Sequence, residues 1–443
     1  MEKIIDSINS ILWDYLLIYL LMGTGIYYTI RLKFIQIRRF ADINRHVFGN
    51  VFRKSGKADQ DGMSSFQALA TSVAAQVGTG NLAGVATAIA SGGPGAVFWM
   101  WVSAFFGMGT IFGEAVLAQK YVDRIDGEIT GGPAYYLRDG LKSKFLSVFF
   151  AIAIIIALGF VGNMVQSNSI AVALNSAFNI PNWIGGVLTA IFAALIFIGG
   201  MGRIASFTEL VVPFMAILYI AGSLVILVAN YTQLIPAFRT ILSSAFSIRA
   251  AAGGVIGATV KEAVRFGIAR GLFSNEAGMG STPHAHAVAK VEHPAEQGLV
   301  AIFGVIFDTL VICSITALIN IVTGSHTLGL TGIEMTQKAF NLGLGNFGTG
   351  FIAISLFFFA FSTIIGWYYF GESNIRFLFG RKGINIYRIL VLVFIVIGST
   401  LAVDMVWKIA DLFNGLMVIP NIIGLLILSP KVIAVLADYE KSN

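Results

Sequence analysis

The chain has 443 residues, of which 56% are hydrophobic and only 12% are charged. An ordinary soluble domain carries about 25% charged residues, so this composition excludes a disordered chain and a protein that coats nucleic acid. The mean hydropathy of +0.81 and the uncharged runs at 149–162, 187–202 and 390–403 indicate that most of the chain lies in a lipid bilayer. The alternating ten-residue pattern of outer-membrane barrels is missing, so the sequence predicts an all-α polytopic membrane protein.

Eleven apolar segments follow one another along the chain, each long enough for one membrane-crossing helix. The first, at 11–30, has acidic as well as basic flanks and lacks a small-residue cleavage site, so we expect a retained span. The single cysteine, Cys313, lies within an apolar run and is expected to be a small buried residue. The segments are centred near residues 20, 77, 107, 160, 193, 219, 265, 310, 362, 396 and 418.

The positions of Lys and Arg predict the orientation. The segment 31–62 carries eight of them, which places this segment in the cytoplasm because cytoplasmic loops are enriched in basic residues. With alternation along the remaining segments, the whole chain has 21 basic residues inside, these eight included, five outside, and three within the seventh segment. We therefore expect a multi-pass protein of the cell membrane with its N-terminus outside and its C-terminus in the cytoplasm.

A short internal repeat predicts how the spans are organised. Residues 81–84 and 275–278 share the pattern Asn-x-Ala-Gly at a separation of 194 residues, and each is followed by Phe-Gly. Five spans start at each copy. Because five is an odd number, the second unit enters the membrane from the opposite side, so the repeat is inverted, which is a transporter architecture. The predicted division is an extra span with a basic loop at 1–62, a first five-helix repeat at 63–230, a second at 231–430 and a cytoplasmic tail at 431–443.

The middle of the second segment contains Gly78, Thr79, Gly80 and Asn81. Each glycine disfavours a helix by about 1 kcal/mol relative to alanine, and the side chains of Thr79 and Asn81 compete for backbone hydrogen bonds. We expect the helix to break here, which would leave amides that attract a carboxylate and carbonyls that attract a cation. The alternative is an unbroken helix whose small residues pack closely against a neighbour.

Charged residues interrupt the seventh segment, where an uncharged span is expected. They are Lys261, Glu262, Arg265, Arg270 and Glu276. We expect a second interruption within 267–278, opposite the first. The alternative is a shorter helix, with Arg270 onward in cytoplasmic water.

Polar residues in other segments leave two interpretations open. In the ninth segment, the hydroxyls of Ser362 and Thr363 either bond back to the preceding turn or face a bound ion. In the fourth segment, Asn163 and Gln166 lie on one helix face and suit either a zwitterion or bonds between helices.

Further titratable residues lie outside these motifs. Glu114 and Asp308 fall within spans, where they could pair with basic groups, form a gate or relay protons. His284, His286 and His293 have no acidic or cysteine partner at metal-ligand spacing, so we expect solvated loop histidines.

Three motifs resemble the alanine/glycine:cation symporters, a family within the amino acid, polyamine and organocation superfamily. They occupy 78–88, 92–101 and 270–280, and the similarity covers nearly the whole chain. The resemblance implies a leucine-transporter-like fold, with a five-plus-five inverted repeat preceded by one extra N-terminal helix. That fold agrees with the eleven spans and the orientation inferred above.

The resemblance also implies roles for particular residues. The amides of Thr79 and Gly80 would hold the substrate carboxylate. The other implied substrate-binding residues are Asn81, Gln166, Ile268, Phe273 and Trp367, of which the last three would close a small pocket. The implied Na+ ligands are the carbonyls of Ala74, Val77 and Phe359 and the hydroxyls of Ser362 and Thr363.

The function implied by the resemblance is secondary active transport, in which Na+ drives the import of alanine or glycine by alternating access. Na+ is then a coupling ion, no cofactor or nucleic acid takes part, and the chain is not an enzyme. The nearest alternative is a proton-coupled amino acid symporter of the same fold. An intramembrane metalloenzyme using Glu276 and the histidines, and a passive channel, are the more distant alternatives.

Overall fold

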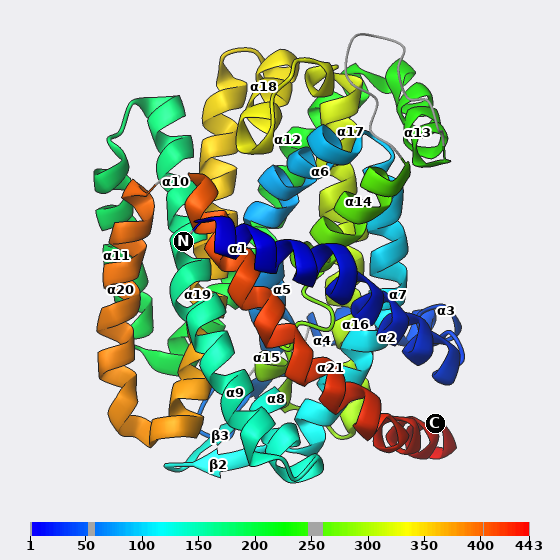
Figure 1. Ribbon diagram of the computed structural model, residues 1–443, viewed down its shortest axis with the longest axis vertical. Helices are drawn as coiled ribbons and strands as arrows, with labels where there is room; N and C mark the ends of the chain where they lie inside the picture. The colour runs from blue at the N-terminus through cyan, green and yellow to red at the C-terminus, as the bar shows by residue number, and fades with distance from the viewer. Residues whose placement is uncertain (1, 52–57, 247–259, 402, 443) are drawn as a thin grey trace.

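The computed structural model describes residues 2–51, 58–246, 260–401 and 403–442, and these are almost entirely helical (Figure 1). The elements before the first predicted repeat are α1 Glu2–Asn9, η1 Ser10–Leu16, α2 Leu17–Arg31, α3 Ile35–Arg38 and α4 Phe40–Val51. Those of the first predicted repeat are β1 Met63–Ser64, α5 Ser65–Gln76, η2 Gly80–Gly84, α6 Val85–Gly92, α7 Ala96–Lys120, β2 Asp123–Ile125, β3 Glu128–Thr130, α8 Pro133–Tyr135, η3 Tyr136–Gly140, α9 Lys144–Ile154, η4 Ile155–Gly162, α10 Asn163–Phe178, α11 Asn182–Phe197 and α12 Gly200–Ala229.

The remaining elements begin with a helix that follows α12 directly and end at the C-terminus. They are α13 Tyr231–Phe246, α14 Val260–Asn275, α15 Pro283–Ala287, β4 Ala289–Lys290, α16 Pro294–Val305, η5 Ile306–Cys313, α17 Ser314–Val322, η6 Ser325–Thr327, α18 Gly332–Leu344, α19 Phe347–Phe379, η7 Gly380–Gly383, α20 Ile384–Thr400 and α21 Val403–Ser442. The strands form two small sheets, β1 parallel to β4 and β2 antiparallel to β3.

Seven helical stretches of the described residues are long and apolar enough to cross a membrane, and a bent pair of helices at 65–92 brings the number to eight. The seven are Lys3–Arg31, Ala96–Lys120, Lys144–Phe178, Gly200–Ala229, Pro294–Val322, Phe347–Thr400 and Val406–Ser442. The stretch Phe347–Thr400 contains two helices, α19 and α20, which η7 separates. The chain is therefore a polytopic helical membrane protein, while the count of eleven spans stays a prediction.

The first predicted break is present. Helix α5 begins with a capping box, in which Ser64 and Gln67 exchange side-chain and backbone hydrogen bonds. It ends at Gln76, and winding resumes at Gly80, after a bend of 49°. The alternative of an unbroken, closely packed helix is wrong at this segment.

The second interruption lies at the end of the predicted stretch. Helix α14 continues through Arg270 and ends at Asn275, and irregular backbone then runs to Thr282. Glu276 begins this linker with a left-handed φ of +58°, a conformation that β-carbon sterics disfavour for residues other than glycine. The linker is buried throughout, so the alternative that places Arg270 onward in cytoplasmic water is wrong.

The two broken helices lie crosswise to each other. The second half of the first, α6, packs against α14, while its first half, α5, packs against α15 (Figure 1). The breaks themselves are joined, because the Gln76 side-chain amide donates to the Asn275 carbonyl oxygen at 2.6 Å. Each half of one broken helix thus meets the opposite half of the other.

Two long helices enclose the breaks. Helix α19 packs against α5 and α10, and helix α7 packs against α14 and α16. These contacts bring the hydroxyls of α19 to the first break and Glu114 of α7 to the second, as described below.

Candidate functional site

Oxygen atoms from α5 and α19 gather at the first break. The Thr363 hydroxyl lies 2.9 Å from the Ala74 carbonyl oxygen, 3.4 Å from that of Val77 and 3.1 Å from that of Phe359. The Ser362 hydroxyl lies 3.3 Å from the Ala74 carbonyl oxygen and 2.9 Å from that of Phe359. The five residues of the expected Na+ site are therefore together and buried.

The two α19 hydroxyls bond back to the preceding turn, which is the first of the two interpretations, and their geometry is also compatible with the second. Each hydroxyl bonds back to Phe359 on its own helix, and each also reaches a carbonyl at the end of α5. Gly78 permits this approach, because a Cβ there would overlap the Thr363 hydroxyl and lie 3.3 Å from Gln166 Oε1. The first break can therefore close on α19 only with glycine at this position.

The expected substrate-binding residues divide into two groups. Thr79, Gly80, Asn81 and Gln166 meet at the first break: the Thr79 amide donates to Gln166 Oε1 at 3.3 Å, and the Gly78 amide donates to Asn81 Oδ1 at 2.8 Å. The Thr79 hydroxyl is buried without a hydrogen-bond partner. A Cβ on Gly80 would be 3.4 Å from Ser274, so Gly80 lies against the end of α14.

The second group consists of Trp367, Phe273 and Ile268. Trp367 lies one turn beyond Thr363, close to Gly162, where a Cβ would be 2.7 Å from the indole ring. Phe273 is two residues before the end of α14 and packs against Trp407, with 5.6 Å between ring centroids and the rings tilted by 45°. Ile268 is buried but lies seven residues before the end of α14, about 10 Å along the helix from Asn275.

Glu114 of α7 holds the second interruption. Its carboxylate accepts hydrogen bonds from the Gly278 amide at 3.0 Å, the Gly280 amide at 2.9 Å and the Asn421 side chain at 2.7 Å. Amides that lost their helical partners are thereby satisfied inside the bundle. Glu114 thus has a backbone-positioning role that its sequence context did not reveal.

Asp308 connects the two breaks. Its carboxylate accepts from Asn81 Nδ2 at 2.6 Å, from the Ser274 hydroxyl at 3.0 Å and from the Thr309 hydroxyl at 2.7 Å. Asn81 therefore bridges the Gly78 amide and Asp308. Among the described residues, neither Asp308 nor Glu114 forms an ion pair with a basic side chain, so the first of the three alternatives for these residues, pairing with basic groups, is wrong.

The expectation of solvated loop histidines is wrong for His284 and His286, which are buried. His284 Nδ1 lies 2.7 Å from the Ser281 carbonyl oxygen, Nε2 lies 2.8 Å from Asn374 Nδ2, and the ring stacks on Phe150 and Phe370. The prediction failed because α15, which carries both histidines, is the second half of a broken helix and enters the bundle. His293 is half-buried at the start of α16, where Nδ1 accepts from the Ala295 amide.

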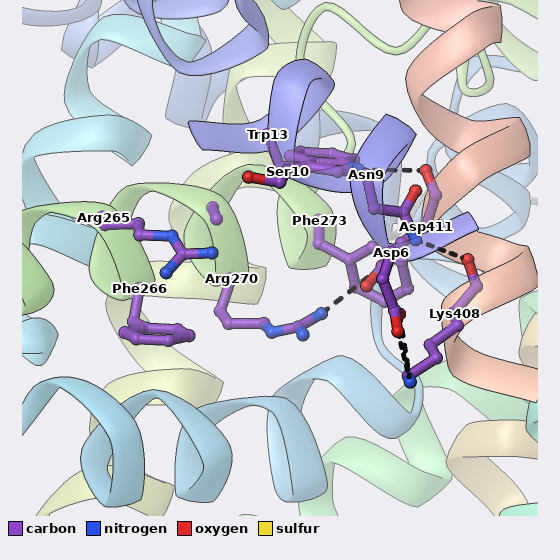
Figure 2. A pocket seen from close by; sticks show the side chains of 11 residues that line it. Asp6, Asn9, Ser10, Trp13, Arg265, Phe266, Arg270, Phe273, Lys408 and Asp411 are labelled. Carbon is purple, nitrogen blue, oxygen red and sulfur yellow. Dashed lines mark hydrogen bonds and ion pairs between the residues drawn. The ribbon is translucent and has the colours of Figure 1, made fainter. Parts of the chain in front are cut away.

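A cavity of about 260 Å³ reaches Phe273 from one surface (Figure 2). Two ion pairs around it join α14 to α21 and to η1, namely Arg270 with Asp411 at 3.6 Å and Arg265 with Asp14. A third joins α21 to α1, namely Lys408 with Asp6 at 3.0 Å. The Arg270 guanidinium also lies over the rings of Phe273 and Trp407. The residues that line the cavity are Asp6, Asn9, Ser10, Trp13, Arg265, Phe266, Ala269, Arg270, Phe273, Lys408 and Asp411.

Comparison with known proteins identifies the family. A family model described as the sodium:alanine symporter family matches residues 1–443. The chain belongs to this family. It is therefore a transporter of the symporter type and not an enzyme.

Relatives in this family are named for different substrates. The chain is 45% identical to the sodium/alanine symporter AgcS of Methanococcus maripaludis, over 98% of this chain and 96% of that protein. It is 44% identical to the probable sodium/glutamine symporter GlnT of Bacillus subtilis, over 100% and 91%. It is 43% identical to the amino-acid carrier protein AlsT of Bacillus subtilis, over 100% and 94%.

A solved structure shares the fold. The Eremococcus coleocola manganese transporter, crystallised with an aromatic bis-isothiourea compound, aligns with a TM-score of 0.56 at 14% identity. The alignment covers 84% of this chain and 78% of that transporter. At this identity the comparison establishes a common transporter fold and carries no information on substrate.

Replacing Glu114 tests whether it holds the second interruption. Glu114→Ala leaves the Gly278 and Gly280 amides buried without an acceptor, at about 1–3 kcal/mol for each unpaired group. Glu114→Gln keeps one carbonyl oxygen, so its loss of stability should be clearly smaller. The melting temperature of the purified protein in detergent measures both, and equal small decreases for the two variants would contradict the proposed role.

Proposed function

We propose that this symporter imports a small neutral amino acid, alanine or glycine, together with Na+ by alternating access. The gathering of five oxygen atoms at the first break, from Ala74, Val77, Phe359, Ser362 and Thr363, supports the ion site most directly. Hard cations prefer oxygen ligands, and carbonyls at the end of an unwound half-helix bind coupling ions in transporters. The family name and the name of the relative from Methanococcus maripaludis agree with this ion.

The substrate site lies beside the proposed ion site in this account. The amides of Thr79 and Gly80 open the second half of the first broken helix, where the positive end of the helix dipole favours a carboxylate. Gln166, which now accepts from the Thr79 amide, would exchange that bond for the substrate. Asn81 would position the break through the Gly78 amide and Asp308.

A small side chain suits the space that we assign to the substrate. Trp367 lies against Gly162, and Phe273, near the end of α14, lines the cavity of Figure 2. These two rings would limit the size of the substrate side chain. Ile268 would contribute packing behind this pocket. We therefore expect the site to accept alanine and glycine and to exclude amino acids with larger side chains.

The finer architecture is part of the same proposal: eleven spans, with a leucine-transporter-like inverted repeat at 63–230 and 231–430 after one extra N-terminal helix. The crosswise packing of α5 and α6 against α15 and α14 supports the inverted relation, because a two-fold axis in the membrane plane exchanges the halves in this way. The packing of α20 against α11 supports separate spans for these two helices.

We propose the cell membrane as the location, with the N-terminus outside and the C-terminus in the cytoplasm. The hairpin of β2 and β3 lies at the same end of the molecule as the C-terminus, whereas α13 and α18 lie at the opposite end (Figure 1). The cavity of Figure 2 would then be an outer entrance. Proton coupling is the alternative, and the uptake experiment below distinguishes it.

Removal of the Thr363 hydroxyl should weaken Na+ binding. Loss of one of five oxygen ligands is expected to raise the Na+ concentration for half-maximal alanine uptake at least about tenfold. The measurement is uptake of labelled alanine into proteoliposomes with purified Thr363→Ala. The control is Thr349→Ala on the same helix, whose hydroxyl accepts only from Asn341, and which should retain the wild-type Na+ dependence.

The same uptake assay tests the alternative. Wild-type uptake should require Na+ and should not be driven by a pH gradient alone. Uptake driven equally well by a pH gradient in the absence of Na+ would support a proton symporter and contradict the proposed ion.

Cysteine labelling tests the orientation. The one native cysteine, Cys313, is buried, so an introduced cysteine is the main target of a maleimide that does not cross membranes. Ser243→Cys on α13 should react in intact cells, whereas Asn385→Cys at the start of α20 should react only after permeabilisation. The reverse pattern would place the N-terminus inside.

A further inference from the structure

Glu276 places a buried carboxylate at the second interruption, and this group is not among the proposed ligands of Na+ or of the substrate carboxylate. The residue is 1% exposed and has the left-handed backbone noted above. Its Oε1 accepts from the Trp367 indole nitrogen at 2.6 Å, and its Oε2 accepts from the Ser281 hydroxyl. An ionised carboxylate can accept about four hydrogen bonds, so these two donors leave capacity for a further ligand.

Glu276 also lacks a charge partner. Among the described residues, no lysine, arginine or histidine forms an ion pair with it, and Arg270 on the preceding helix pairs with Asp411 instead. Glu114 is satisfied by two backbone amides and Asn421, and Asp308 by Asn81, Ser274 and Thr309. A buried charge without a partner costs several kcal/mol, so a negative charge at Glu276 calls for a cation that arrives from outside the chain.

The neighbours of Glu276 place it at the candidate substrate site. Trp367 is one helical turn from Thr363, so the indole that holds Glu276 is on the face of α19 that meets the first break. Asn275, the preceding residue, accepts from Gln76, which directly precedes Val77. Glu276 therefore lies where the two breaks meet, as Gly80 does through its approach to Ser274.

We propose that the Glu276 carboxylate binds the ammonium group of the substrate and makes the site selective for amino acids over hydroxy acids and other carboxylic acids. This inference rests on the proposed function, in which the amides of Thr79 and Gly80 hold the substrate carboxylate. The two ends of the zwitterion then meet groups of opposite sign, one from each broken helix. The Trp367 and Ser281 hydrogen bonds orient the carboxylate before the substrate arrives.

A pair of ligands isolates this interaction. Lactate has the shape of alanine with a hydroxyl in place of the ammonium group. Wild-type protein in Na+ should bind alanine at least about 100-fold more tightly than lactate, because the hydroxyl leaves Glu276 unpaired. Glu276→Gln should lower alanine affinity at least about 30-fold and leave lactate affinity within about threefold, measured by calorimetry or by competition with labelled alanine.

Two further variants separate substrate binding from structure. Glu276→Asp keeps the charge and should keep the preference for alanine over lactate, at reduced affinity. Glu114→Gln changes the α7 carboxylate that accepts from the backbone amides of the same linker, and it should leave the alanine-to-lactate ratio at the wild-type value. The Na+-induced rise in melting temperature without amino acid should persist in Glu276→Gln, because the proposed ion ligands are intact.

The outcomes distinguish this inference from the proposed function. If wild-type protein fails to bind alanine in Na+, the proposed function fails. If wild-type protein binds alanine but Glu276→Gln keeps the wild-type ratio, or loses alanine and lactate equally, the role of Glu276 is wrong and the proposed function stands. Should Glu276→Gln fail to fold, loss of the alanine preference in folded Glu276→Asp would overturn the inference as well.

Discussion

Backbone groups that lose their helical partners inside a membrane must find new ones, and the rest of this structure follows from that requirement. The chain unwinds twice within the bundle, at 77–79 and at 276–282. Water cannot satisfy the freed amides and carbonyls at these depths. At the first break, carbonyls of α5 meet two hydroxyls of α19, and at the second, amides of the linker meet Glu114. Each satisfied break is also a set of polar atoms that a ligand can use.

The crosswise packing of the two broken helices turns two local defects into one site. Gln76 joins the end of α5 to the end of α14, and Asp308 joins Asn81 to Ser274. The carbonyls and hydroxyls on one side suit a small cation, while the amides of Thr79 and Gly80 and the carboxylate of Glu276 suit the two ends of a zwitterion. Ion and amino acid would then be neighbours, and each would stabilise the arrangement of backbone that the other needs.

Local signals in the sequence were sufficient to predict the first break and to single out Ser362 and Thr363, whereas Ala74, Val77 and Phe359 were implied by the family resemblance and the ion site stays a proposal. Two glycines beside Thr79 and Asn81 weaken a helix wherever they occur, and Ser362 and Thr363 stand out in an aromatic helix. The position of the second interruption was less accurate, because the charges of α14 precede the point where winding is lost. The extended pattern of apolar segments predicted a polytopic helical protein, which is confirmed, and the similarity of three motifs predicted the family, which is also confirmed.

Contacts between distant parts of the chain could not be read from the sequence. Glu114 meets a linker 164 residues away, and His284 meets Asn374 across 90 residues. No spacing rule predicts such partners, so the buried histidines looked like loop residues and the buried carboxylates looked like candidates for ion pairs. Their roles became visible only when the two breaks were placed against α7 and α19.

The central claim is that Na+ and the amino acid bind next to each other at the first break, and reciprocal binding measurements test it most directly. Binding of alanine to purified protein should be titrated at a series of Na+ concentrations, and binding of Na+ at a series of alanine concentrations. The account predicts that saturating Na+ tightens alanine binding and that saturating alanine tightens Na+ binding by the same factor, as thermodynamic linkage requires. An alanine dissociation constant that does not change with Na+ would contradict it.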